Sequence, residues 1–409
     1  MARLVEEAQA SKAPAEQFVD RFSRLYTPIV VAVAVVLAVV PTVLGASFGE
    51  WFYRARALLI IACPCALVIS TPVTGVSGIG AASRRGILVK GGAALEAAGR
   101  LKALAFDKTG TLTEGRPVVS RVVALNGKGE AEVLTLAAAL ERRLEHALAI
   151  LTAAGGAELH PVSGFRSVAG RGAEGEVDGK RYLIGSPRLF AERGIALDGA
   201  EEALEVIERA GETPVVLGIA DGLLAVFGLA DSLRPDAKAT VEALRESGAE
   251  ELMMLMGDAE APARRVAEEF GIGYKARLLP EQKIEAVRAL VARHGDAGMV
   301  GDGVNDAPAL AASSVGFAMG AAGTDVAPET ADVALMRDDL PKLAEAVRLS
   351  RVAERIIRQN VFVSIAIKGL FVLLAPFGLV ALWRAVLADM GTSIAVTLNG
   401  LRLFRKGSA

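Results

Sequence analysis

The sequence contains little of what would mark a disulfide-stabilised or nucleic-acid-binding protein. Its 409 residues include only two cysteines, Cys63 and Cys65, which are separated by a single residue and are poor candidates for a structural disulfide. The formal net charge of −2 argues against a nucleic acid or another polyanion as a partner. The sequence also contains no internal repeat, so a repeat architecture is excluded.

Apolar residues, by contrast, are abundant. Hydrophobic residues make up 52% of the chain and charged residues 22%, with a mean hydropathy of +0.41. This mixture favours membrane spans joined to ordinary soluble domains. Helices buried inside a soluble protein are the alternative. Four stretches are predicted to span a bilayer, the last being the weakest: residues 28–46, 57–79, 361–380 and 381–401.

Basic residues flank these stretches on one side. Arginine and lysine clusters follow the second stretch, precede the third and close the chain. Because such clusters are retained in the cytoplasm, the sequence predicts a multi-pass protein of the cell membrane whose large loop is cytoplasmic.

The large loop has the pattern of an α/β fold. Short apolar runs end in acidic, glycine-bearing loops, as strands do in an open parallel sheet. Residues 118–228 differ, because glycine-rich turns alternate there with strand-like segments. The predicted fold class is therefore a membrane α-helical part of about four spans plus a cytoplasmic α/β domain with an inserted α+β domain.

The run Asp107-Lys108-Thr109-Gly110-Thr111 directly follows an apolar, strand-like segment. A carboxylate at a strand end, with backbone donors and a lysine beside it, can attack a γ-phosphate and form an aspartyl phosphate. A plain polar turn is the alternative. The pattern predicts Asp107 as the nucleophile, with Lys108 and Thr109 assisting.

A second acidic loop carries Asp302 and Asp306 after another apolar segment. Mg²⁺ takes oxygen ligands and few protein carboxylates, so Asp107 and Asp302 are predicted to bind it, with Asp306 as a further catalytic residue. Lys283 could offset the charge of a phosphoryl group, although a lysine in such a segment is more often a surface residue.

The segment Cys63-Pro64-Cys65 lies inside an apolar stretch. Proline interrupts helical hydrogen bonding, which allows two thiolates to point into one cavity. Thiolates prefer soft or borderline cations such as Zn²⁺, Cd²⁺, Pb²⁺ or Cu⁺. Two small buried residues beside a kink are the alternative.

Two charged residues, Lys368 and Asp389, lie in the last two apolar stretches. Charges at membrane depth are costly unless they are paired or functional. Snorkelling to the interface is the alternative, more so for the long lysine side chain.

The Asp107 loop, the loop containing Asp302 and Asp306, and Lys283 together resemble the phosphorylation domain of P-type ATPases, which has a haloacid dehalogenase-like fold. This family resemblance implies ATP and Mg²⁺ as cofactors. It also implies an aspartyl-phosphate intermediate.

The Cys-Pro-Cys segment is similar to that of the heavy-metal branch of this family. Lys368 and Asp389 resemble the zinc/cadmium/lead subgroup, in which the aspartate helps to bind the ion and the lysine is an internal counter-charge. With Cys63 and Cys65 these residues form the implied transport site. The implied function is ATP-driven export of Zn²⁺, Cd²⁺ or Pb²⁺ across a lipid bilayer.

The resemblance also assigns a nucleotide site and a set of domain limits. It implies that Glu141, His146, Gly170 and Gly172 contact ATP, and that Asp231 lies at the hinge where the chain leaves the inserted domain. The implied domains are a lead-in (1–26), two membrane helix pairs (27–80 and 351–409), a phosphorylation domain in two parts (81–117 and 229–350) and a nucleotide-binding domain (118–228).

Several positions depart from the family pattern. Met256 stands where a threonine usually precedes Gly257 and Asp258, the latter a predicted catalytic residue, and Ala147 stands where a proline usually follows the histidine. Ser186 replaces an asparagine of copper-type relatives. The Thr-Gly-Glu segment of the actuator domain is not in the sequence, which implies a pump lacking its front portion or a separate chain that supplies the actuator.

Two alternatives stay open from the sequence alone. One is a non-catalytic membrane remnant that binds metal and ATP, favoured by Met256; the other is a soluble haloacid dehalogenase-like phosphatase with fortuitous apolar helices.

The 409-residue chain is expected to bind ATP but to turn it over poorly, because it contains no Thr-Gly-Glu to position the water that hydrolyses an aspartyl phosphate. Steady-state phosphate release in detergent, with and without Zn²⁺ or Cd²⁺, measures this. Sustained metal-stimulated hydrolysis would contradict the expectation.

Overall fold

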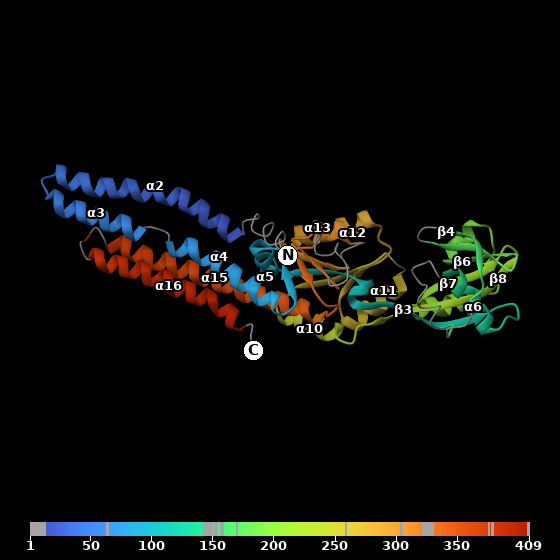
Figure 1. Ribbon diagram of the computed structural model, residues 1–409. Helices are drawn as coiled ribbons and strands as arrows, with labels where there is room; N and C mark the ends of the chain where they lie inside the picture. The colour runs from blue at the N-terminus through green and yellow to red at the C-terminus, as the bar shows by residue number, and fades with distance from the viewer. Residues whose placement is uncertain are drawn as a thin grey trace.

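The computed structural model describes most of the chain, and it is elongated, with a helical stalk at one end and two sheets at the other (Figure 1). The residues described are 14–62, 65–141, 150, 154–155, 159–168, 171–257, 260–302, 306–320, 331–374, 377 and 380–406.

The stalk is made of the helices that contain the predicted membrane spans. They are α2 (Pro14–Val43), α3 (Phe48–Ala62), α4 (Cys65–Ser83), α15 (Pro341–Leu374) and α16 (Leu382–Lys406). In the described part of the chain, three segments are long and apolar enough to cross a membrane: Gln17–Val43, Phe48–Ser83 and Pro341–Leu374. A helix suits such sequences because it satisfies every backbone hydrogen bond internally.

The fourth predicted span differs from the other three. Helix α16 includes Arg384, Asp389 and a basic C-terminal end, and it is not among the helices that meet the length and hydropathy criteria. It nevertheless lies along α4 and α15 in the stalk (Figure 1). Buried polar contacts join it to α15: the Asn360 side chain donates to the Val396 carbonyl at 3.1 Å and accepts from the Asn399 side chain at 2.8 Å.

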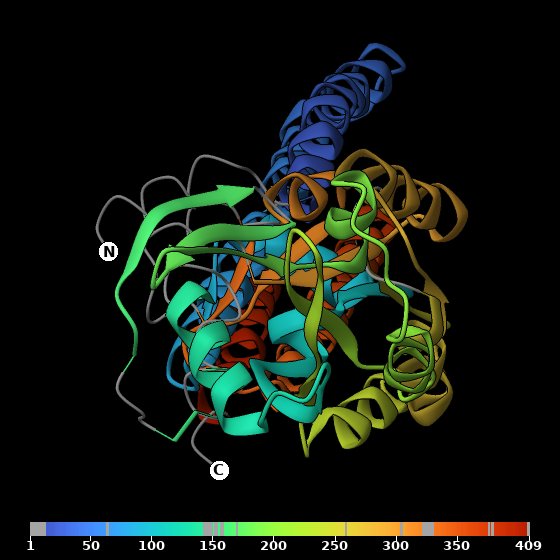
Figure 2. The same cartoon turned by 90° about the vertical axis from the view of Figure 1, so that its right-hand side faces the viewer.

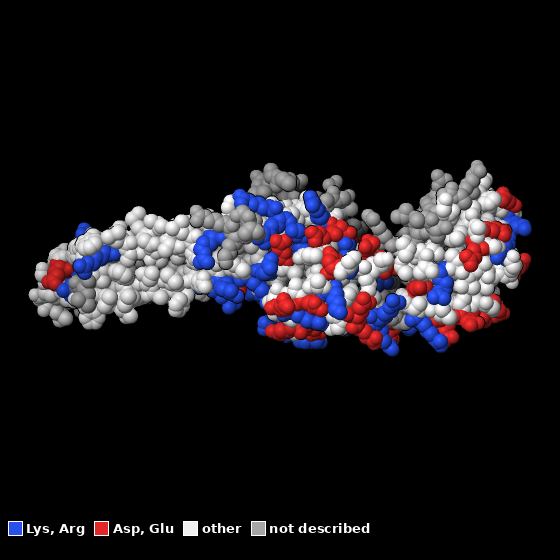
Figure 3. Space-filling model, turned by 90° about the horizontal axis from the view of Figure 1, so that it is seen from below, with Lys and Arg blue, Asp and Glu red and all other residues white. Residues whose placement is uncertain are grey.

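Charged side chains are distributed unevenly along the stalk. The visible face is nearly free of them over its middle, with charge at the far tip and a basic band where the stalk meets the first sheet (Figure 3). Exposed arginines flanking the apolar segments on that side include Arg84, Arg355 and Arg402. This distribution matches a membrane segment whose basic end faces the cytoplasm.

The first sheet has seven strands in the order β1-β13-β12-β11-β2-β9-β10. All neighbouring strands are parallel except β1 and β13. The strands are β1 (Ile87–Val89), β2 (Ala103–Asp107), β9 (Glu251–Leu255), β10 (Gly273–Lys275), β11 (Ala297–Gly301), β12 (Val315–Ala318) and β13 (Val333–Leu335). Their apolar runs are buried, as expected for a parallel sheet covered on both faces.

Helices cover both faces of this sheet and form two cores. One core includes residues of α5 (Gly92–Arg100), α10 (Ala237–Glu246), α11 (Glu260–Phe270) and the N-terminal part of α15. The other is formed with α12 (Pro280–His294) and α13 (Ala307–Ala312). This is the doubly wound α/β architecture, in which functional groups gather at the carboxyl ends of the strands.

The second sheet is antiparallel, with six strands in the order β3-β8-β7-β6-β5-β4. They are β3 (Thr113–Ala124), β4 (Val162–Val168), β5 (Gly172–Val177), β6 (Lys180–Gly185), β7 (Thr213–Ile219) and β8 (Gly222–Leu233). Helices α6 (Glu130–Glu141), α8 (Pro187–Glu192) and α9 (Glu201–Arg209) accompany it. Figure 2 views the molecule from this end, with the stalk receding behind.

The paired strands β3 and β8 lead into and out of this second unit. The predicted domain limits at residues 117/118 and 228/229 fall inside these two strands. The six-stranded unit therefore matches the expected α+β insertion in kind, while the domain limits stay a prediction.

Helix α15 connects the first sheet with the membrane. Its 34 residues include Leu343 and Val347 in a core of the seven-stranded sheet, and Ser364 and Lys368 buried in the stalk. Gly99 of α5 packs against it closely, since a Cβ atom there would lie 2.7 Å from the Ser350 carbonyl oxygen.

Substituting Gly99→Ala is expected to destabilise the protein by about 2 kcal/mol, because the added methyl group meets backbone that cannot move without shifting α15. Thermal unfolding in detergent measures the effect. Gly75→Ala in α4 is the matched control: its Cβ meets nothing within 4 Å, so unchanged or slightly higher stability is expected. Equal stability of the two variants would contradict the close α5–α15 packing.

Candidate functional site

The sheet brings the two predicted acidic loops together. Strands β2 and β11 are parallel neighbours, with Phe106 paired to Val300, so Asp107 and Asp302 follow the carboxyl ends of adjacent strands. A single turn over Lys108–Leu112 follows Asp107, whose carboxylate accepts a hydrogen bond from the Thr109 backbone N–H at 3.1 Å. The backbone thus fixes the direction of the Asp107 carboxylate.

Lys283 reaches this edge of the sheet from the first turn of α12. Its Nζ lies 2.6 Å from Oδ1 of Asp107 and 3.0 Å from Oδ1 of Asp306. Pro280 occupies the start of α12, and the Gln282 side chain accepts from the Leu279 N–H at 2.9 Å, which caps the helix. Asp306 is buried and precedes α13.

Burial and neighbouring negative charges favour the protonated, neutral form of the carboxyl groups at this site. Burial raises the pKa of Asp107 to about 6, and nearby Asp306 adds to the rise, while Lys283 opposes it. Burial also raises the pKa of Asp306 against the opposing effect of Lys283. Burial alone would lower the pKa of Lys283, but the two carboxylates outweigh it, so its net shift is upward and it stays an ammonium.

The residues present fit a divalent cation of the Mg²⁺ type. Asp107 and Asp306 share one ammonium, that of Lys283, and Asp302 lies near enough to both to raise their pKa, which leaves an excess of carboxylate oxygen. Mg²⁺ takes oxygen donors and would relieve that repulsion. Asp107 and Asp302, on adjacent strand ends, are the residues that would hold it.

Two residues at the return from the six-stranded unit support the loop after Asp107. Asp231 accepts a hydrogen bond from the Thr113 hydroxyl at 2.6 Å. The buried guanidinium of Arg234 donates to the carbonyls of Thr111 and Gly110 at 2.9 and 3.1 Å. Asp231 lies near the end of β8, and its predicted hinge role stays a prediction. Sequence reasoning missed Arg234, because its partners lie more than a hundred residues earlier in the chain.

Arg234 is also tied to a third segment. It donates to the carbonyl and carboxylate of Asp338 at 3.1 and 2.5 Å. The guanidinium thus joins the loop after Asp107 to the segment that leads into α15.

The predicted nucleotide residues are only partly placed. His146 and Gly170 lie outside the described residues, as does Asp258, and Glu141 is the last residue of α6. Gly172 starts β5 with φ of +149°, and a Cβ there would lie 2.0 Å from the Ile184 carbonyl oxygen. Close strand packing thus accounts for this glycine, and the nucleotide role of the segment stays a prediction.

In the stalk, Lys368 and Asp389 form an ion pair. The Lys368 ammonium lies 2.7 Å from Oδ1 of Asp389 and 3.4 Å from the Ile61 carbonyl oxygen. Ile61 is next to the end of α3, where helical carbonyls lack partners, and α4 begins at Cys65. The pair therefore lies beside the end of α3, next to the segment in which the sequence places Cys63 and Pro64. Residues 63 and 64 are outside the described residues, so the helix break stays a prediction.

One expectation for the cysteines is wrong. The short spacing predicts no disulfide, but Cys65 is disulfide-bonded in the structure. Only the reduced thiolate can ligate a metal ion, so the metal-binding role predicted for Cys65 applies to the reduced protein.

A family model described as haloacid dehalogenase-like hydrolase matches residues 101–313, and the chain belongs to this family. Nearly its whole length is also similar to metal-transporting members. It is 46% identical over 413 residues to a probable cadmium-transporting ATPase of Staphylococcus aureus (strain MRSA252), covering 98% of this chain and 57% of that protein.

It is 45% identical over 409 residues to the zinc/cadmium/lead-transporting P-type ATPase of Escherichia coli (strain K12), covering 99% of this chain and 55% of that protein. A crystal structure of a zinc-transporting PIB-type ATPase in the E2·Pi state superposes with a TM-score of 0.77 at 44% identity, covering 98% of this chain and 66% of that one. The chain thus spans about half the length of these curated relatives.

These comparisons confirm the predicted resemblance to soft-metal P-type ATPases and the predicted fold class. The chain is a multi-pass membrane protein with a haloacid dehalogenase-like α/β part.

The raised pKa of Asp107 predicts a pH-dependent stability. The folded protein keeps a proton on Asp107 up to about pH 6, whereas the unfolded carboxyl loses it near its ordinary value of 3.8. Folding free energy should therefore become less favourable as the pH rises from about 4 to about 6. In chelator, Asp107→Asn should be more stable than the parent above pH 6 by about 3 kcal/mol, with the difference shrinking toward pH 4.

Thermal unfolding across this pH range measures the difference. Asp198→Asn, at an exposed position, is the control and should show no such pH dependence. A stability gain for Asp107→Asn of equal size at every pH would mean that the carboxyl is not the cause.

Proposed function

We propose that this chain is the catalytic and ion-pathway part of a P-type ATPase that exports a soft divalent metal ion. The observation that carries the proposal is the Lys368–Asp389 pair beside the end of α3, in a chain whose first sheet presents Asp107 to Lys283. Two similar proteins are named as transporters of cadmium or of zinc, cadmium and lead.

The phosphoryl-transfer step uses the Asp107 carboxylate as the nucleophile. One oxygen attacks the γ-phosphorus of ATP, the bond to the β,γ-bridging oxygen breaks, and ADP leaves with that electron pair. The Thr109 N–H orients the carboxylate, and the Lys283 ammonium, held by Asp306, offsets the charge of the phosphoryl oxygens. When bound, Mg²⁺ adds charge neutralisation between Asp107 and Asp302.

The attacking carboxylate must be ionised, and its surroundings make this costly. Because its pKa is about 6, most Asp107 side chains are deprotonated at neutral pH. A weakly stabilised carboxylate is more basic and hence a better nucleophile than one held by many donors. The same burial that destabilises the folded protein thus favours the chemistry.

ATP is assigned to the six-stranded unit. Glu141, His146, Gly170 and Gly172 would contact the adenine and the adjoining backbone, as the family resemblance implies. Asp231 at the hinge, which accepts from Thr113, would link the position of this unit to the loop after Asp107.

The transported ion is assigned to Cys63, Cys65 and Asp389. Two thiolates and one carboxylate suit Zn²⁺, Cd²⁺ or Pb²⁺ better than Cu⁺, which favours sulfur ligands alone. After the ion leaves, the Lys368 ammonium neutralises Asp389, a role that the 2.7 Å contact between these two side chains supports.

The other two functions are less well supported. The burial of Met256 in the core of the first sheet agrees with a non-catalytic remnant, since a thioether replaces a hydroxyl there. The intact contacts of Asp107 and Lys283 oppose it. Three helices of membrane-spanning length in the described residues oppose a soluble phosphatase.

Labelling with γ-³²P-ATP and Mg²⁺ in detergent tests the proposal directly. We expect an acid-stable, hydroxylamine-sensitive label on the reduced protein that requires Zn²⁺ or Cd²⁺, is not supported by Cu⁺ and is absent in Asp107→Asn. Lys283→Met should reduce the labelling rate by about 100-fold or more, because one preorganised charge is lost.

Asp178→Asn, an exposed turn residue of the six-stranded unit, is the matched control and should label normally. No label with any metal, in a folded protein that binds ATP, would replace the pump with a non-catalytic binding protein.

A further inference from the structure

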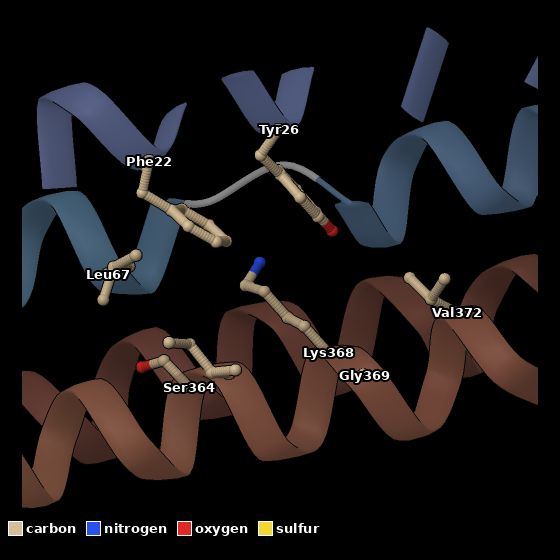
Figure 4. Close-up of a pocket in the computed structure, with 8 residues that line it drawn as sticks. Phe22, Tyr26, Leu67, Ser364, Lys368, Gly369 and Val372 are labelled. Carbon is tan, nitrogen blue, oxygen red and sulfur yellow. The ribbon is translucent and has the colours of Figure 1, made fainter. Parts of the chain in front are cut away.

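Two cavities in the stalk meet at Lys368. A small one of about 10 Å³ lies on the Asp389 side, next to Ile61 and Thr392. A larger one of about 120 Å³ lies between α2, α4 and α15, and the Lys368 side chain points toward it (Figure 4). We refer to the larger cavity as the aromatic chamber; it is lined by Phe22, Tyr26, Leu67, Ser364, Ile365, Lys368, Gly369 and Val372.

The aromatic chamber has two aromatic rings on one side. Phe22 and Tyr26 are one turn apart on α2, and their rings stack with centroids 4.9 Å apart and an interplanar angle of 18°. Both rings lie across the chamber from α15 and approach the Lys368 side chain (Figure 4). Aromatic faces attract ammonium groups.

On the α15 side the chamber is lined by Ser364, whose hydroxyl is unsatisfied among the described residues. Ser364 lies one turn before Lys368 and is fully buried. Its Oγ has no hydrogen-bond partner among the described residues. A buried polar atom without a partner destabilises the folded state, so a donor that entered the chamber would be stabilised there.

If a metal ion binds at Asp389 as proposed above, the Lys368 ammonium requires a second position. Asp389 binds the Lys368 ammonium through Oδ1 in this structure. A divalent cation on the same carboxylate would lie within a few ångströms of the ammonium, where little water screens the repulsion. Lys368 must therefore move away from Asp389 when the metal ion binds.

We propose that the aromatic chamber receives the Lys368 ammonium when a divalent metal ion occupies Asp389. This inference rests on the proposed function. Ser364 Oγ accepts one ammonium N–H, and the rings of Phe22 and Tyr26 stabilise the charge through their faces. The flexible lysine stem allows the movement without a change in α15, since Lys368 already lines both cavities. Phe22, Tyr26 and Ser364 are then positioning residues for metal binding.

Other occupants fit the aromatic chamber less well. A soft metal ion would find hydroxyls and rings but no thiolate there. A lipid chain would fill the apolar part and leave the Ser364 hydroxyl unpaired. The ammonium alone matches both the rings and the hydroxyl.

The test measures metal affinity of the reduced full chain in detergent, by competition of Zn²⁺ and Cd²⁺ with a chromophoric chelator. Ser364→Leu fills the chamber and should weaken binding of both ions about tenfold, because the displaced ammonium loses its site. Val363→Leu, at the neighbouring exposed position, is the matched control and should bind like the parent.

The same substitution in a Lys368→Met background separates this role from a packing effect. With no ammonium to accommodate, Ser364→Leu should change affinity less than twofold there. Tyr26→Leu should behave like Ser364→Leu, while Tyr26→Phe, which keeps the ring, should bind nearly as the parent does.

Two results would overturn the chamber role while leaving the metal site intact. In one, Ser364→Leu weakens metal binding equally with and without Lys368; in the other, it weakens binding in neither background. Failure of the proposed function looks different: the parent would bind neither ion, or Asp389→Asn would bind as tightly as the parent. That result would overturn the metal site and the chamber role together.

Discussion

A lysine ammonium removed from water needs carboxylates beside it, and both candidate sites are built on that requirement. Lys283 has Asp107 and Asp306, and Lys368 has Asp389. Burying an unpaired charge costs several kcal/mol, so each lysine requires that elements far apart in the sequence meet around it. The first pairing holds α12 against the ends of β2 and α13. The second pairing holds α15 against α16 beside the end of α3.

The two sites differ in how the charges balance, and this decides what each can do. Around Lys283 the carboxylates are in excess, because Asp107 and Asp306 share its one ammonium, so a cation can be added without removing the lysine. Around Lys368, within the part of the chain that the structure describes, one ammonium pairs with the Asp389 carboxylate. A cation can enter there only if the lysine moves. An excess of carboxylates suits a cofactor ion that remains with its nucleotide, whereas a balanced pair suits an ion that must leave.

Much of this arrangement follows from the sequence, and the exceptions have physical causes. Asp107 and Asp302 were predictable because parallel strands present their carboxyl ends at one edge, and the Lys368–Asp389 pair because lone charges are not tolerated at membrane depth. The contacts of Arg234 could not be predicted, since three of its four acceptors are backbone carbonyls, which carry no sequence signal, and the fourth is the distant Asp338 carboxylate. The nucleotide role predicted for Gly172 stays a prediction, and the strand register adds a second requirement for glycine there, because a Cβ atom would meet the neighbouring strand.

Helix α15 is the element through which the two sites can influence one another. It is one continuous helix of 34 residues, about 50 Å long, with its N-terminal part in a core of the seven-stranded sheet and Lys368 near its other end. Arg234 binds both the loop after Asp107 and Asp338, three residues before α15 begins. A shift of that loop can therefore be passed to the helix as a rigid-body displacement. Coupling requires that the membrane site has two arrangements of different metal affinity. An ammonium that lies either on Asp389 or in the aromatic chamber supplies two such arrangements, and a small movement of α15 relative to α2 and α16 would change their balance.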